Sequence, residues 1–161
     1  MLVIIGCGNS NRLDDGAGVY VARQLMSIMK ANPVDQVRVY DAGTAGMDIM
    51  FRARGCDALI IIDANQSASE PGTIFEVPGL ELENIPEPSY NLHDFRWDNA
   101  LYAGRRIYQE QFPADIAVFL IEAENLDLGI GLSESVQKAS DRVVALITER
   151  INRYSQTRCN T

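Results

Sequence analysis

The chain has little of several residue types on which common functions depend. Its 161 residues include one histidine and three cysteines. A single histidine excludes any mechanism or metal site that needs two. Three cysteines without a CxxC pair favour a reducing cytoplasm over a disulfide scaffold. No apolar run approaches the ~20 residues of a membrane span, and no basic residue precedes the apolar start, which predicts a first strand and not a signal peptide.

Basic residues are also scarce. The 14 Lys and Arg residues face 22 Asp and Glu residues, and the formal net charge of −8 argues against nucleic acid as the main partner. Lys30 and Lys138 are the only lysines, so no basic membrane-binding patch is expected. Apolar residues make up 47% of the chain, as in globular proteins. We expect one domain over 1–161, in which about the last six residues form a flexible tail.

Apolar patterning predicts an α/β sandwich around a mostly parallel sheet. The predicted strands are 1–5, 36–40, 58–62, 74–78 and 116–121, and the predicted helices begin after Asp15, at Thr44, near Trp97 and at Ser133. Asp14 or Asp15 is expected to cap the first helix. The gap before 74–78 is too short for a helical crossover, so this strand is expected to be antiparallel or at an edge. The proline-containing stretch 80–90 predicts an extended surface loop.

Polar residues follow the predicted strands, where ligands bind in such sheets. They lie in 6–18, 41–44 and 63–65, with His93 further along and Glu122 and Glu124 after the last strand. We expect them to converge on one rim. Carboxylates with one imidazole would form an open metal site that suits nickel, copper or zinc, although it is too sparse for structural zinc.

Each of these residues also has a structural interpretation. The glycines of 6–18 can serve a tight turn, and a lone histidine is more often structural than a ligand. Cys7 has no identifiable base and is better explained as a small buried apolar residue. Trp97 and Tyr108, on one helical face, are most simply core. Asp63 is the hardest to explain structurally, because it directly follows an apolar central strand.

Five ordered segments carry a more specific signal. They are GCGNSNRLDDGAG at 6–18, DAGT at 41–44, IDA followed by PGTI within 62–74, SYNLHDF at 89–95, and the stretch 121–133 that ends in GIGLS. In order and spacing, these segments resemble the hydrogenase maturation proteases. Proteins of that family are endopeptidases that remove a C-terminal extension from the large subunit of nickel–iron hydrogenases.

The resemblance implies a three-layer α/β/α sandwich with a mostly parallel five-stranded sheet, of the phosphorylase/hydrolase-like kind. It also implies an aspartyl-type endopeptidase that recognises nickel carried by the precursor and has no permanently bound cofactor. An assembly chaperone is a possible further partner. The residues implied are Asp15, Asp63 and His93 for the metal, Asp41 for catalysis, and Asn9, Gly43 and Thr44 for substrate binding.

The chain departs from the family pattern at two places. Asp15 stands where the family often has the longer Glu, and 65–67 (NQS) replaces a stretch that often holds glycine. The pattern leaves open whether nickel or a carboxylate activates the attacking water. Two other functions are weighed against the protease: a non-catalytic nickel-binding assembly chaperone and, with less support, a receiver domain that accepts phosphate. The receiver lacks support because Glu122 and Glu124 stand where it needs a lysine.

Overall fold

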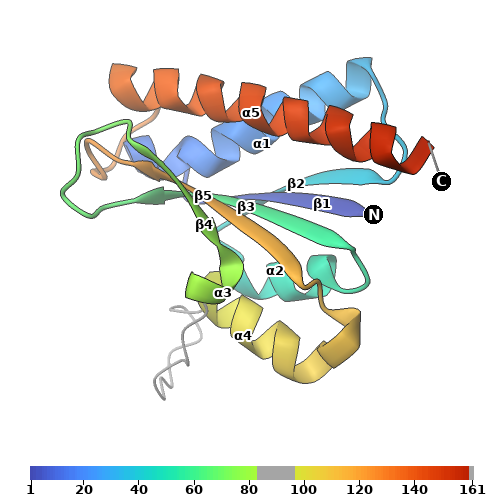
Figure 1. Cartoon of the computed structure of the whole chain (residues 1–161). Coiled ribbons are helices and arrows are strands. Elements are labelled where there is room, and N and C mark those ends of the chain that lie inside the picture. Colours follow the sequence, from blue (N-terminus) through green and yellow to red (C-terminus); the bar gives the residue numbers. More distant parts are fainter. Residues whose placement is uncertain (83–96, 160–161) are drawn as a thin grey trace.

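The computed structural model describes residues 1–82 and 97–159, with side chains for 1–81 and 97–157. Strands and helices alternate along most of the chain (Figure 1). The strands are β1 (Leu2–Cys7), β2 (Val37–Gly43), β3 (Ala58–Asn65), β4 (Ile74–Pro78) and β5 (Asp115–Glu122). The α-helices are α1 (Ala17–Ala31), α2 (Gly46–Ala53), α3 (Gly79–Leu82), α4 (Trp97–Tyr108) and α5 (Glu134–Cys159).

The five strands form one sheet in the order β2-β1-β3-β5-β4. All neighbouring pairs are parallel except β4 with β5, which places the antiparallel strand at an edge, as predicted. Helices α1 and α5 cover one face of the sheet, and α2 and α4 cover the other (Figure 1). The predicted three-layer sandwich with a mostly parallel sheet is confirmed.

Burial on both faces explains the uninterrupted apolar strands. Leu2 and Ile4 of β1 pack in the core beneath α1 and α5. Val3 and Ile5 point the other way, into the core beneath α2 and α4. Because successive side chains of a strand point to opposite faces, a strand covered by helices on both sides needs an apolar residue at every position.

The structure corrects several predicted details. The cap residue of α1 is Gly16 and no side chain caps this helix, so neither Asp14 nor Asp15 has the expected role. The short helix α3 occupies the start of the predicted extended loop, whose remainder lies outside the described residues. Helix α5 extends as far as Cys159, and the flexible tail expected for about the last six residues stays a prediction. Within the described residues, no helix is long and apolar enough to cross a membrane.

Candidate functional site

A cavity of about 480 Å³ opens at the carboxyl ends of β1, β2 and β3. It lies where parallel sheets of this kind bind their ligands. Its walls include four of the residues expected to act at the site: Asp15, Asp63, Gly43 and Thr44. The cavity therefore unites residues from three separate motifs of the sequence.

The carboxylate of Asp63 is oriented by two hydrogen bonds. Its Oδ1 accepts from the backbone N–H of Ala64 at 2.9 Å, and its Oδ2 accepts from Nε1 of Trp97 at 2.8 Å. Trp97 is only 6% exposed and lines the same cavity at the start of α4. The prediction that Trp97 is core is correct, but it missed the indole N–H, which places this residue in the site.

Asp15 and Asp63 both lie next to Gly8, the residue that follows β1. Oδ2 and the carbonyl oxygen of Asp15 accept from the backbone N–H of Asn9 at 3.1 and 3.2 Å. Between the two aspartates lies Gly8, with a φ of +122°. A Cβ at Gly8 would approach the carbonyl oxygen of Asp15 to 1.8 Å and Oδ1 of Asp63 to 3.6 Å. Glycine is therefore required here by both conformation and space, because a side chain would displace the backbone of Asp15.

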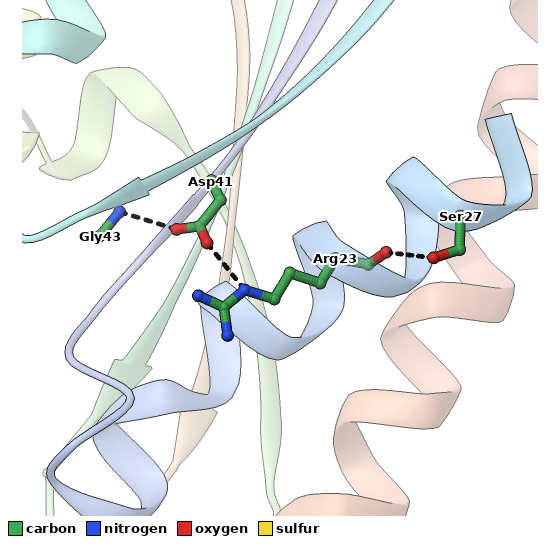
Figure 2. A network of polar contacts seen from close by, with 4 residues as sticks. All are labelled: Arg23, Ser27, Asp41 and Gly43. Carbon is green, nitrogen blue, oxygen red and sulfur yellow. Dashed lines mark hydrogen bonds and ion pairs between the residues drawn. The ribbon is translucent and has the colours of Figure 1, made fainter. Parts of the chain in front are cut away.

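Asp41 lies outside the cavity lining and points to other partners (Figure 2). Its Oδ2 accepts from Nε of Arg23 at 2.9 Å, and its Oδ1 accepts from the backbone N–H of Gly43 at 3.0 Å. Gly43 has a φ of +52° and lines the cavity together with Thr44. Asp41 thus fixes the turn that carries both residues. The predicted substrate-binding residue Asn9 is not part of the lining, and its Oδ1 accepts from the backbone N–H of Asn11.

Asp14 is fully buried and joins two loops that are far apart in sequence. Its Oδ1 accepts from the backbone N–H of Ser133 at 2.7 Å. Its Oδ2 accepts from the backbone N–H groups of Glu124 and Asn125 and from the hydroxyl of Ser133, at 2.9 to 3.0 Å. The carboxylate serves the segment that leads into α5 instead of the first turn of α1. Sequence could not show this, because the partners lie about 110 residues further along the chain.

Glu122, the last residue of β5, and Glu124, just beyond it, do not line the cavity. Glu122 is buried and accepts hydrogen bonds from Asn65, Ser67 and Ser69. Burial alone would raise the pKa of Glu122, but these hydrogen bonds outweigh burial and the pKa is lowered. Glu124 accepts from the hydroxyl of Ser135. Both glutamates lie at the same carboxyl edge of the sheet as the aspartates, since Glu122 pairs with Asn65 of β3 and the backbone N–H of Glu124 donates to Asp14. Glu122 organises the β3–β4 connection and does not contribute to the cavity wall.

Cys7 is buried at the end of β1 and lines the cavity. Burial raises the pKa of its thiol well above the ordinary value, and the nearby carboxylates of Asp63 and Asp41 raise it further. A nucleophilic cysteine needs the opposite environment, because the thiolate is the reactive form. The interpretation of Cys7 as a small buried apolar residue is supported.

His93 lies outside the described residues, so its predicted role stays a prediction. Within the described part of the chain, no three His, Cys, Asp or Glu side chains gather as a metal site. The cavity thus offers the carboxylates of Asp15 and Asp63 as its acidic groups. Two carboxylates can complete the coordination of a metal that arrives with other ligands, or one of them can accept a proton from water.

Comparisons with known proteins agree with this arrangement. A family model described as hydrogenase maturation protease matches residues 19–150. The chain is 30% identical to the hydrogenase 2 maturation protease of Escherichia coli, over 92% of this chain and 91% of the relative. It is 31% identical to a protein of Methanocaldococcus jannaschii whose name provisionally places it in the same class, over 94% of this chain and 97% of the relative.

Solved structures show the same fold. The hydrogenase maturating endopeptidase HybD from Escherichia coli matches with a TM-score of 0.70 at 25% identity, covering 92% of this chain and 93% of that one. The [NiFe] hydrogenase maturation protease HybD from Thermococcus kodakarensis matches in fold with a TM-score of 0.73 at 24% identity, covering 93% and 98%. These relationships confirm the predicted endopeptidase class and leave no support for a receiver domain. The chain belongs to the hydrogenase maturation protease family.

Proposed function

We propose that this chain is the endopeptidase that removes the C-terminal extension of a nickel–iron hydrogenase large-subunit precursor after nickel has been inserted. The observation that carries the proposal is the cavity whose wall contains the carboxylates of both Asp15 and Asp63, beside Gly8. Family membership supplies the reaction class, and the cavity supplies a place where a metal-bearing segment of the precursor can be held.

Nickel serves in this proposal as the recognition element and belongs to the substrate. A precursor segment that carries nickel presents open coordination positions, which carboxylates and an imidazole can fill. Asp15 and Asp63 would fill two of them and His93 a third. A precursor without metal offers no such contacts, so the two forms differ in affinity. The indole of Trp97 supports this role because it fixes the direction of the Asp63 carboxylate.

The role of Asp41 is proposed in two forms. A direct catalytic role stays a prediction. Its bonds to Arg23 and to the backbone N–H of Gly43 favour the other form, in which Asp41 holds the turn that contacts the substrate through Gly43 and Thr44. The proposal also assigns the reaction to the cytoplasm and includes an assembly chaperone that presents the precursor.

The test is incubation of the purified protein with purified nickel-loaded precursor, followed by mass spectrometry of the products. The proposal predicts a mass loss equal to one C-terminal peptide. The Asp63→Ala and His93→Ala variants are expected to lose this activity while their circular dichroism spectra stay unchanged. If the precursor binds but its mass does not change, the protein is a non-catalytic nickel-binding chaperone and the protease proposal is wrong.

A further inference from the structure

Two large aliphatic side chains are almost fully exposed beside the cavity. Leu128 is 85% exposed and Ile130 is 88% exposed. Both lie in the segment 125–133 between β5 and α5, which we call the β5–α5 loop. Exposed apolar residues are common singly. Here two large ones lie on one short loop with only Gly129 between them, and clustered exposed apolar side chains mark interaction sites.

The β5–α5 loop is tied down at both of its ends. The buried carboxylate of Asp14 accepts from the backbone N–H of Asn125 at 2.9 Å and from that of Ser133 at 2.7 Å. Because the acceptor is charged, these bonds are stronger than ordinary backbone hydrogen bonds. The ends of the loop are therefore fixed to the turn that also carries Asp15.

The middle of the loop is tied down as well. Gly129 forms a β-bridge to the β1–α1 connection. Its carbonyl accepts from the backbone N–H of Leu13 at 3.1 Å, and its own N–H donates to the carbonyl of Asn11 at 3.0 Å. Nε of Arg12 donates to the carbonyl of Leu126 at 3.1 Å. The loop thus presents Leu128 and Ile130 from a backbone that is already ordered, and binding a partner there requires little further ordering.

The exposed pair is continuous with the candidate active site. Leu126, in the same loop, forms part of the cavity wall. The two residues from Leu126 to Leu128 span at most about 7 Å of chain. The exposed pair therefore lies close to the cavity wall, within reach of a polypeptide that leaves the cavity over this loop.

We propose that Leu128 and Ile130 form a docking surface for an apolar segment of the precursor polypeptide that lies beside the cleavage site. The inference rests on the proposed function, because the cavity defines the occupant: a protein substrate whose cut segment lies at the wall formed by Leu126. The docking surface supplies affinity for the polypeptide, whereas Asp15 and Asp63 supply selectivity for the metal. Burial of two aliphatic side chains against the substrate is sufficient for a change of about tenfold or more in affinity.

The test compares a double variant, Leu128→Ser with Ile130→Ser, with the wild type in steady-state cleavage of nickel-loaded precursor. The docking surface predicts a KM raised about tenfold or more with kcat little changed, because the lost contact acts equally in the ground and transition states. The pair Leu128→Met with Ile130→Leu keeps the apolar surface and is expected to restore the wild-type KM.

Ile107→Ser is the matched control. Ile107 is 61% exposed on the last turn of α4, and about 15 Å of helix separates it from Trp97 at the cavity. The KM of the Ile107→Ser variant is expected to equal that of the wild type. The inference is overturned if the double variant keeps a KM within about twofold of the wild type, or if Ile107→Ser raises KM to the same extent.

A binding measurement separates this inference from the proposed function. Immobilised precursor is titrated with wild type and double variant, and the dissociation constants are compared. If the wild type binds but does not cleave, and the double variant binds about tenfold more weakly, the docking surface stands while the protease function falls. If the wild type cleaves and the two dissociation constants agree, the docking surface falls while the protease function stands. If the wild type does not bind the precursor, both are wrong.

Discussion

The substitution Asp14→Asn is expected to lower the free energy of unfolding substantially without altering the shape of the side chain. Asp14 is fully buried and accepts from two backbone N–H groups and one hydroxyl through Oδ2, and from a third backbone N–H through Oδ1. Asparagine keeps one acceptor oxygen, which in the better orientation takes the place of Oδ2, and its N–H₂ group then faces the backbone N–H of Ser133. Donors that face donors lose their hydrogen bonds, and a bond to a charged acceptor contributes about 1.5–3 kcal/mol.

The magnitude follows from how many donors can find a substitute. The backbone N–H of Ser133 faces the new amide and loses its bond. The bonds from the backbone N–H groups of Glu124 and Asn125 persist but weaken, because their acceptor becomes neutral. We therefore expect a loss of about 3 kcal/mol, which corresponds to a decrease in Tm of about 6–12 °C for a domain of this size.

The assay is urea denaturation followed by circular dichroism, with Asp15→Asn as the matched control in the neighbouring position. The side chain of Asp15 accepts from a single backbone N–H, that of Asn9, and the asparagine oxygen can still accept it. The control is expected to lose less than about 1 kcal/mol of stability but to lose precursor cleavage. The reasoning is refuted if Asp14→Asn is destabilised by less than about 1 kcal/mol, or if both variants lose stability equally.

Three further predictions concern single side chains around the cavity. Trp97→Phe removes the hydrogen bond to Asp63 and keeps the apolar ring, so kcat for precursor cleavage is expected to fall about tenfold with Tm nearly unchanged; an unchanged kcat would contradict the role of the indole. Cys7→Ala is expected to retain cleavage, and iodoacetamide at pH 7 to leave the wild type active, because the raised pKa keeps the thiol protonated; inactivation in either test would implicate a thiolate. Glu122→Gln is expected to lower the unfolding free energy at pH 7. Folding lowers the pKa of Glu122, so its stabilising contribution is present above its ordinary pKa of 4.5 and is lost as the pH falls through the lower folded value. The difference in unfolding free energy between wild type and Glu122→Gln should therefore shrink in acid. A difference that is constant with pH would contradict this.

Much of the fold could be predicted because a strand that is buried on both faces has an apolar residue at every position of its sequence. The runs at 1–5 and 58–62 are apolar at every position because helices cover both faces of β1 and β3. The edge strand β4 occupies the predicted residues 74–78, since the preceding gap is too short for a crossover helix. The carboxyl ends of the strands were harder to place: β2 and β3 continue through Gly43 and Asn65, where polar residues end the apolar pattern but the backbone stays extended.

The site could be predicted only as far as its motifs are local. Asp15 follows β1 and Asp63 lies near the carboxyl end of β3, and the two strands are neighbours in the sheet, so topology alone brings both residues to one cavity. The functions of Asp14 and Glu122 depend on loops that are distant in sequence, and no local pattern reports which N–H groups a buried carboxylate will meet. The helical spacing of Trp97 predicts a core residue, but spacing carries no information about the direction of its indole N–H, which donates to Asp63.

The central claim is that Asp15 and Asp63 recognise nickel that the precursor carries. It is tested most directly by measuring the cleavage rate of one purified precursor in two forms, loaded with nickel and free of metal, with the same enzyme preparation. The account predicts cleavage of the loaded form alone, and loss of that cleavage in Asp15→Ala and Asp63→Ala. Equal cleavage of the two forms would show that the metal is not the recognition element.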